Sequence, residues 1–101
     1  MKIKIIFTES AYHDLEDIEN YYKDIDVGYK KIINNILNQI QYLESFPTMG
    51  TSLYEIINVK NNYRFTHSEN YVIFYTYING TIYIGRILHS KRNYLKILLD
   101  I

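Results

Sequence analysis

Apolar positions along the chain follow a helical period up to about residue 46 and a strand-like period after about residue 52. Residues 2–7 alternate with the period of two that is typical of a short, half-buried strand. Thr8 or Ser10 then offers a side-chain oxygen for the N-cap of a helix, which we expect to end near residue 24. The apolar positions of this helix share one face and are Ala11, Leu15, Ile18 and Tyr22. We expect its acidic residues to face water; they are Glu9, Asp14, Glu16, Asp17 and Glu19.

A second helix is predicted after Asp26, which we expect to be its N-cap. Its apolar stripe consists of Tyr29, Ile33, Ile36, Ile40 and Leu43. Phe46-Pro47 ends this helix, because the residue before a proline is disfavoured in the α region. The short connection between the two helices predicts a helical hairpin.

Residues 53–89 are rich in β-branched and aromatic side chains and predict strands over 53–59, 63–67, 71–78 and 81–89. Asn79-Gly80 between the last two runs predicts a two-residue type I′ turn with Ile78 opposite Thr81. This register, continued without interruption, places Tyr71, Ile73, Tyr75 and Tyr77 on one face together with Ile82, Ile84, Arg86 and Leu88. The opposite face then holds Val72, Phe74, Thr76, Tyr83, Ile87 and His89.

Both faces of this hairpin are largely apolar, so we expect it at the centre of a sheet that is covered on both sides. The predicted helices cover one side of the sheet, and a partner protein is one candidate for the cover of the other side. Residues 93–101 have helical spacing and predict either a short helix or a segment that orders only on binding. The predicted fold is one α+β domain of residues 1–101 in the order β-α-α-β-β-β(-α). Its helical hairpin packs on one face of a small, mostly antiparallel sheet.

Composition narrows the class of protein. A length of 101 residues with 48% hydrophobic residues fits a single globular domain. The absence of cysteine excludes disulfides and thiolate metal sites. Because residues 1–7 lack a continuous apolar stretch and the longest uncharged run is too short to span a bilayer, we expect a soluble, cytoplasmic protein.

The 11 basic and 11 acidic residues balance in number but not in position. Residues 9–26 hold seven acidic residues and one lysine. Residues 60–99 hold one acidic residue, Glu69, against the basic residues Lys60, Arg64, Arg86, Lys91, Arg92 and Lys96. This separation predicts a basic end of the sheet that suits a polyanion or an acidic peptide, although solubilising surface residues would give the same count.

Candidate chemistry is limited to this basic set. The three histidines have no metal-ligand spacing, and we expect no metal and no cofactor. Arg86 interrupts an apolar face, so it either pairs with a carboxylate of the first helix, such as Glu19, or faces a groove. Convergence of Arg64, Arg86, His89 and Tyr94 would provide phosphate stabilisation and proton transfer without a metal.

The chain resembles the RelE/ParE superfamily of type II toxins over nearly its whole length. The matching segments are Ala11 with Asp14-Leu15, residues 18–22, residues 43–50, Tyr63-Arg64, residues 71–75 and residues 86–94. The resemblance implies a growth-inhibiting toxin that is neutralised by a small antitoxin wrapped around it. The ending R-I-L-H-S-K-R looks more like the ParE branch, associated with plasmid stabilization, whose members poison DNA gyrase.

The resemblance also assigns expected roles. In the RelE-like alternative, a metal-independent nuclease that cleaves mRNA on the ribosome, the catalytic residues would be Arg64, Arg86, His89 and Tyr94. The expected target-binding residues are Arg86, His89, Lys91, Arg92 and Lys96. The expected antitoxin-binding residues are Tyr71, Ile73, Tyr75, Tyr77 and Ile84, contacted by an acidic and apolar segment that folds on binding.

Because no lysine-rich central strand is present, we favour a non-enzymatic toxin that forms a heteromeric complex with its antitoxin and acts on gyrase. The ribosome with mRNA is the alternative target, and no membrane contact is expected. A non-toxic nucleic-acid-binding module and a scaffold protein remain alternatives from other classes.

Overall fold

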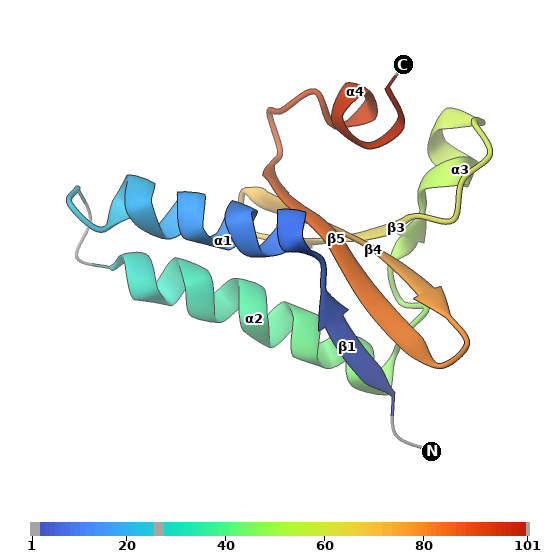
Figure 1. Cartoon of the computed structure of the whole chain (residues 1–101), viewed down its shortest axis with the longest axis horizontal. Coiled ribbons are helices and arrows are strands. Elements are labelled where there is room, and N and C mark those ends of the chain that lie inside the picture. The colour runs from blue at the N-terminus through green and yellow to red at the C-terminus, as the bar shows by residue number, and fades with distance from the viewer. Residues whose placement is uncertain (1–2, 26–27, 101) are drawn as a thin grey trace.

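The structure is a computed structural model that describes residues 3–25 and 28–100. Its elements follow the order β1 (Lys4–Phe7), α1 (Glu9–Tyr22), α2 (Tyr29–Ser45), β2 (Thr51–Ser52), α3 (Leu53–Ile57), β3 (Arg64–Ser68), β4 (Tyr71–Ile78), β5 (Thr81–His89) and α4 (Tyr94–Leu99). The sheet has the strand order β1-β5-β4-β3-β2, in which only the β1–β5 pair is parallel (Figure 1). The predicted α+β class is confirmed, and the β4–β5 hairpin lies inside the sheet as expected.

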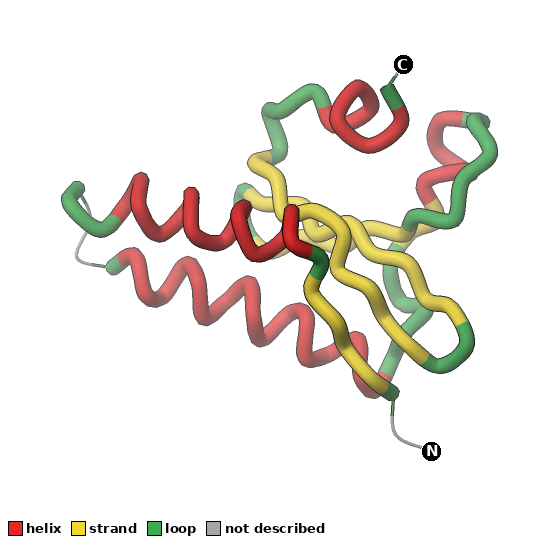
Figure 2. Tube along the Cα trace, in the orientation of Figure 1, coloured by secondary structure: helices red, strands yellow, loops and turns green. Residues whose placement is uncertain are grey.

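The α1–α2 hairpin covers one face of the sheet, which we call the hairpin face (Figure 2). Thr8 caps α1, since its side-chain oxygen accepts a hydrogen bond from the Ala11 N–H at 3.2 Å. The predicted N-cap of the second helix, Asp26, lies outside the described residues. Buried residues of both helices meet the sheet in one core, made of Ala11, Ile18, Ile36, Ile40 and Leu43 against Tyr71, Ile73, Tyr75, Ile82, Ile84 and Ile87.

The prediction of a strand over residues 53–59 is wrong. β2 ends at Ser52, and the chain turns at once into α3, which Asn58 closes in the left-handed conformation with a φ of 56°. Only Leu53 of this helix is buried, while Tyr54 and Ile56 are exposed. Periodicity cannot separate a strand from a helical turn in so short an apolar run.

The β4–β5 hairpin contains an irregularity that the sequence register did not include. The Asn79-Gly80 turn and the pairing of Ile78 with Thr81 are as predicted. The register then shifts, because Tyr75 pairs with Ile84 but Phe74 pairs with Arg86, which leaves Gly85 as an extra residue. A β-bulge of this kind exchanges the faces of the residues that follow it.

The face assignments after Gly85 are therefore corrected. Ile87 and His89 lie opposite Ile73 and Tyr71, whereas Leu88 lies opposite Val72. Ile87 accordingly joins the core beneath the helical hairpin, and Leu88 joins the cluster on the other side of the sheet.

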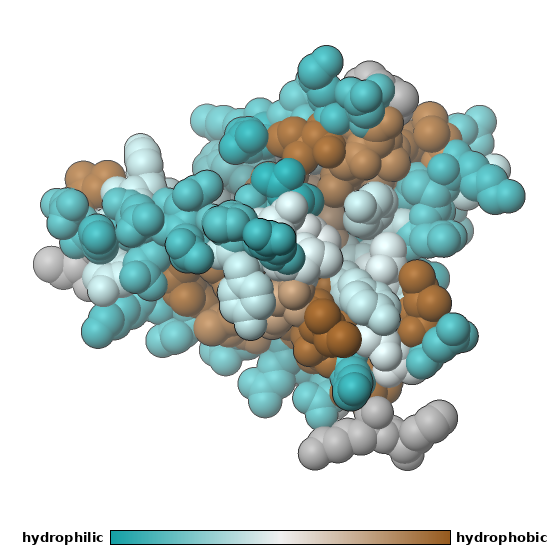
Figure 3. Space-filling view, in the orientation of Figure 1, coloured by the Kyte–Doolittle hydropathy of each residue, from teal (hydrophilic) through white to brown (hydrophobic). Residues whose placement is uncertain are grey.

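Helix α4 covers part of this second face, which we call the α4 face. Its residues Tyr94, Ile97 and Leu98 pack against the buried residues Val72, Phe74 and Leu88. The 93–101 segment is thus helical over residues 94–99, with the Asn93 side chain as its cap. One apolar area of the surface lies where α4 meets the sheet and continues toward α3, and others lie beside β1 and near the β4–β5 turn (Figure 3).

The cover on the α4 face is incomplete. Ile6 pairs with Tyr83, and both remain about 40% exposed, as does Ile78 at the end of β4. The fold therefore presents an open apolar area on the part of the sheet that α4 does not reach.

No helix within the described ranges is long and apolar enough to cross a membrane.

Candidate functional site

Arg86 forms the central ion pair of the molecule. Its Nε and Nη2 atoms donate to Oδ2 and Oδ1 of Asp14, each at 2.8 Å, and the Ile87 N–H donates to Oδ2 at 2.8 Å. The Asp14 side chain is only 8% exposed and that of Arg86 27%. The hydrogen bond to Asp14 is the main cause that raises the pKa of the Arg86 guanidinium.

The chain reaches this geometry because α1 begins directly after β1. The Thr8 N–H donates to the Ile84 carbonyl at 3.0 Å, and the Thr8 hydroxyl donates to the Gly85 carbonyl at 2.9 Å. These bonds hold the first turns of α1 along the edge of β5, so that Asp14 meets the backbone beyond the bulge.

The predicted pairing of Arg86 with a carboxylate of the first helix is confirmed, but the partner is Asp14 and not Glu19, so the expectation that Asp14 is solvated is wrong. Asp14 follows Ala11 by three residues and precedes Ile18 by four, which places it on the buried stripe of α1. This spacing was the signal in the sequence that could have identified it.

His89 and Arg92 lie near this ion pair. They line a small cavity of about 150 Å³ together with Asp14, Asp17 and Tyr21. The His89 ring contacts Tyr71 edge-on at a centroid distance of 5.4 Å, and its Nδ1 accepts the Lys91 N–H at 3.2 Å. Three of the predicted target-binding residues are exposed in the segment after β5, namely Lys91, Arg92 and Lys96.

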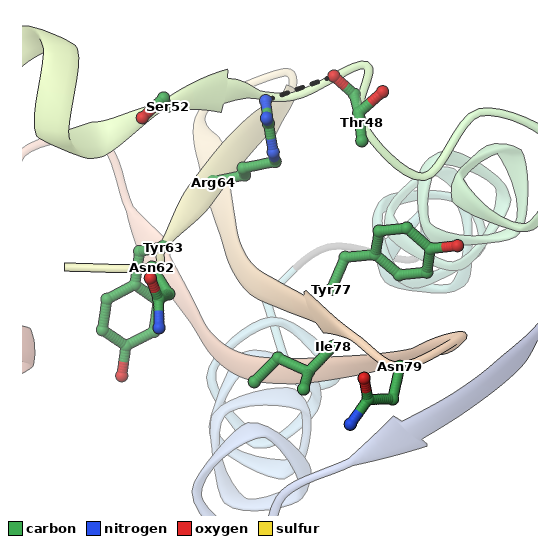
Figure 4. A pocket seen from close by; sticks show the side chains of 8 residues that line it. All are labelled: Thr48, Ser52, Asn62, Tyr63, Arg64, Tyr77, Ile78 and Asn79. Atoms are coloured by element: carbon green, nitrogen blue, oxygen red, sulfur yellow. Dashed lines mark hydrogen bonds between the residues drawn. The ribbon is translucent and has the colours of Figure 1, made fainter.

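Arg64 lies at the beginning of β3 and borders a different hollow. Its Nη1 atom donates to the carbonyls of Gly50 at 2.8 Å and Thr48 at 3.3 Å. The hollow has a volume of about 480 Å³ and is lined by Thr48, Ser52, Asn62, Tyr63, Arg64, Tyr77, Ile78 and Asn79 (Figure 4). We call it the Arg64 hollow. Of these residues, the sequence had suggested only Arg64 and Tyr77 as site residues.

Tyr75 fixes the loop that forms one wall of the Arg64 hollow. Its hydroxyl accepts the Gly50 N–H at 2.9 Å and donates to the Pro47 carbonyl at 2.9 Å. Burial raises the pKa of Tyr75, so the hydroxyl stays protonated and keeps its donor role at neutral pH.

The four residues of the predicted nuclease set do not converge. The Arg86 guanidinium is bound to Asp14, and that of Arg64 is bound to the carbonyls of the 48–50 loop. The Tyr94 ring packs on Phe74 on the α4 face at a centroid distance of 5.2 Å. Only His89 shares a cavity lining with the Arg86 partner Asp14. Among the described residues, no group of histidine and acidic side chains could hold a metal ion.

The predicted antitoxin-binding set is mostly inaccessible in this structure. Tyr71, Ile73, Tyr75 and Ile84 are buried beneath α1 and α2, with at most 8% exposure. The expectation that they form a partner surface is corrected, because the chain's own helices occupy their face of the sheet. Tyr77, which is 37% exposed, is the member of the set that a partner can reach.

Two groups of solved structures share this arrangement of a helical hairpin on a mixed sheet. A toxin–antitoxin structure described as the chromosomal ParDE system from P. aeruginosa matches with a TM-score of 0.72 and 19% identity, covering 86% of this chain and 95% of that chain. A crystal structure of the E. coli DinJ-YafQ toxin-antitoxin complex matches with a TM-score of 0.63 and 14% identity, covering 98% and 99%. A second E. coli DinJ-YafQ complex gives a TM-score of 0.62 and 14% identity over 96% and 98%.

These likenesses show that the chain has the fold found in such complexes. Among curated proteins, none matches the sequence significantly. The family model described as ParE toxin of type II toxin-antitoxin system, parDE, matches residues 5–94, and the chain belongs to this family.

Proposed function

We propose that this chain is the toxin of a type II toxin–antitoxin pair and that it arrests growth by binding and poisoning DNA gyrase. The observation that carries the proposal is the ParE family match over residues 5–94. The fold likeness to the ParDE structure from P. aeruginosa supports the same branch and a complex with a cognate antitoxin.

The geometry favours a toxin that acts by binding over one that cleaves RNA. Metal-independent cleavage needs a proton donor, a proton acceptor and phosphate-binding groups within reach of one phosphate. Here Arg64 and Arg86 bind protein groups on different parts of the sheet, and Tyr94 packs on Phe74 on the α4 face. The RelE-like alternative therefore requires a rearrangement of these side chains on the ribosome.

The exposed basic residues after β5 are the proposed target contacts. Lys91, Arg92 and Lys96 lie on or beside α4 and project charge from the surface. The antitoxin is proposed to cover the open apolar area of the α4 face, which includes Ile6, Tyr83 and Ile78. The acidic residues of an antitoxin segment would match the charge of the basic residues after β5, and its apolar residues would match the open apolar area.

Regulated expression tests the toxin assignment. Expression of the wild-type chain should stop growth, and co-expression of the small protein encoded beside its gene should restore growth. Purified chain should then increase gyrase-linked DNA cleavage while leaving mRNA on programmed ribosomes intact. Codon-linked mRNA cuts with unaffected gyrase would establish the RelE-like alternative instead.

Charge removal tests the proposed target surface. The double variant Arg92→Ala/Lys96→Ala should reduce gyrase poisoning about tenfold without loss of stability, because exposed charges at an interface mainly guide association. Lys30→Ala/Lys31→Ala removes two exposed charges from α2 and is the matched control. Equal activity of the two double variants would place the target contact elsewhere.

A further inference from the structure

The Arg64 hollow lies beside the C-terminal end of β4, along which β3 does not extend. Pairing between these strands begins at Arg64 opposite Tyr75, so no strand among the described residues pairs with residues 76–78 of β4 on that side. The hollow is lined by residues from the end of β4, the start of β3 and the loop before β2 (Figure 4).

Backbone groups of Tyr77 are available at this edge. Ile78 and Thr81 flank a two-residue turn and exchange hydrogen bonds with each other. In an antiparallel pair the bonded positions alternate, so the N–H and C=O of Tyr77 point away from β5, toward the hollow. No hydrogen bond within the described residues uses them. They can therefore pair with an added extended segment.

Arg64 provides a second, independent recognition element. Its Nη1 atom is held by two carbonyls, whereas its Nε and Nη2 atoms have no partner among the described residues. The Nε–H and Nη2–H of a guanidinium are parallel donors that match the two oxygens of a carboxylate. No salt bridge within the described ranges neutralises this charge.

The composition of the lining favours a peptide over a nucleic acid. Arg64 is the single charged residue among the eight that line the hollow, and its neighbours are neutral polar groups, two tyrosines and Ile78. Nucleic-acid binding relies on several cations that follow successive phosphates. A volume of about 480 Å³ accommodates only a few residues of a peptide.

We propose that the Arg64 hollow binds a short extended segment of the antitoxin, in which one aspartate or glutamate forms a two-hydrogen-bond pair with Arg64 while its backbone pairs with Tyr77. This inference rests on the proposed function, since it assigns an anchoring contact to the antitoxin. It places that contact at the end of β4, where Ile78 belongs both to the hollow and to the open apolar area of the α4 face.

Asn79→Asp is the most selective test, because it adds a carboxylate to the hollow without removing Arg64. Aspartate also suits the first position of a type I′ turn, so the hairpin is preserved. With the antitoxin that restores growth as the probe, binding measured by titration calorimetry should weaken about fivefold, and added salt should reduce the difference. Asn70→Asp places the same charge at the exposed turn before β4, and the antitoxin should bind it as it binds the wild type.

Substitution of Arg64 separates charge from geometry. Arg64→Gln should weaken antitoxin binding about 30-fold, and Arg64→Lys should recover part of the loss because it restores the charge but not the paired donors. Unfolding curves identify any Arg64 variant whose 48–50 loop has been destabilised. If a variant is destabilised, the Asn79→Asp result decides whether the hollow binds the antitoxin. Replacing each antitoxin carboxylate in turn should identify one whose loss has no further effect in Arg64→Gln.

The outcomes distinguish the two proposals. If the antitoxin restores growth but binds Asn79→Asp and Asn70→Asp equally, the hollow is not its anchor and the toxin assignment stands. If no protein restores growth, both proposals fail. If a 12-nucleotide single-stranded RNA binds the wild type and loses affinity in Arg64→Gln, the hollow is a nucleic-acid site and the peptide proposal is wrong.

Discussion

Individual residues determine how β5 presents its side chains, and Gly85 and Asp14 have the largest effect. The bulge at Gly85 shifts every later residue of the strand to the opposite face. A side chain at this position would also bring its Cβ within 3.3 Å of the Tyr63 ring. Asp14 then accepts hydrogen bonds from both Arg86 and the Ile87 backbone, which binds the bulged strand to α1.

Asp14→Asn is expected to destabilise the protein strongly. The amide cannot neutralise Arg86, and one of its two polar atoms is a donor that faces other donors. We expect a loss of about 2–4 kcal/mol in the free energy of unfolding, measured by urea denaturation. Asp17→Asn, an exposed acid on the same helix, should change stability by less than about 0.5 kcal/mol. Equal stability of the two variants would show that the ion pair contributes little.

At the residue scale, the sequence indicated that Arg86 needs a partner but did not indicate which carboxylate it binds. Arg86 stood out because a charge on an apolar strand needs a partner. Glu19 was named as an example of such a partner, and Asp14 was placed among the acids that face water. Gly85 was the available signal of a bulge, yet a strand glycine does not reveal by itself which way the extra residue shifts the register.

Among the elements, the loop of residues 47–50 connects the helical hairpin to the sheet. Tyr75 holds its backbone at Pro47 and Gly50, and Arg64 holds it at Thr48 and Gly50. The loop therefore sets both the end of α2 and one wall of the Arg64 hollow. Its stability depends on a close approach of the Gly50 backbone to the Tyr75 ring.

Gly50→Ala tests this close approach. A Cβ atom at Gly50 would lie 2.6 Å from the Tyr75 hydroxyl and 2.9 Å from the Phe65 carbonyl, so buried atoms must move. We expect a loss of about 2–3 kcal/mol in thermal or urea unfolding. Thr51→Ala changes the next, exposed residue and should cost less than about 0.5 kcal/mol. A fully stable Gly50→Ala variant would indicate that the loop can move away from Tyr75 at little cost.

Elements with strong local signals were predicted correctly, and those that depend on distant contacts were not. The Asn79-Gly80 turn and the apolar stripe of α2 can be recognised from the local sequence alone. The run from Leu53 to Ile57 becomes a helix because only Leu53 is buried, which depends on packing that its own sequence does not specify. The Arg64 hollow likewise arises from the point at which β3 begins, and no motif marks that point.

For the whole molecule, the two charged regions are adjacent and not at opposite ends. The acidic helix α1 lies along β5, where Asp14 pairs with Arg86 and Asp17 shares a cavity lining with Arg92. The basic surface predicted from residue counts is therefore partly neutralised by α1. Local features such as the Arg64 hollow and the exposed residues after β5 retain their positive charge.

This arrangement predicts weak binding to nucleic acid in general. A 20-base-pair duplex should bind with a dissociation constant above about 100 µM in roughly 0.15 M salt, by fluorescence anisotropy, because few phosphates can be contacted at once. Tighter binding with a steep salt dependence would support the alternative of a nucleic-acid-binding module.

The parallel pairing of β1 with β5 also affects how the chain folds during its synthesis. The Thr8 hydroxyl and the Gly85 carbonyl that join these strands are 77 residues apart in the sequence. The N-terminal strand and the apolar face of the α1–α2 hairpin must therefore wait for the last strand to emerge before they are buried. A partly synthesised chain exposes these surfaces and lacks the Arg86 pair, so a partner that recognises the finished fold can bind only a nearly complete chain.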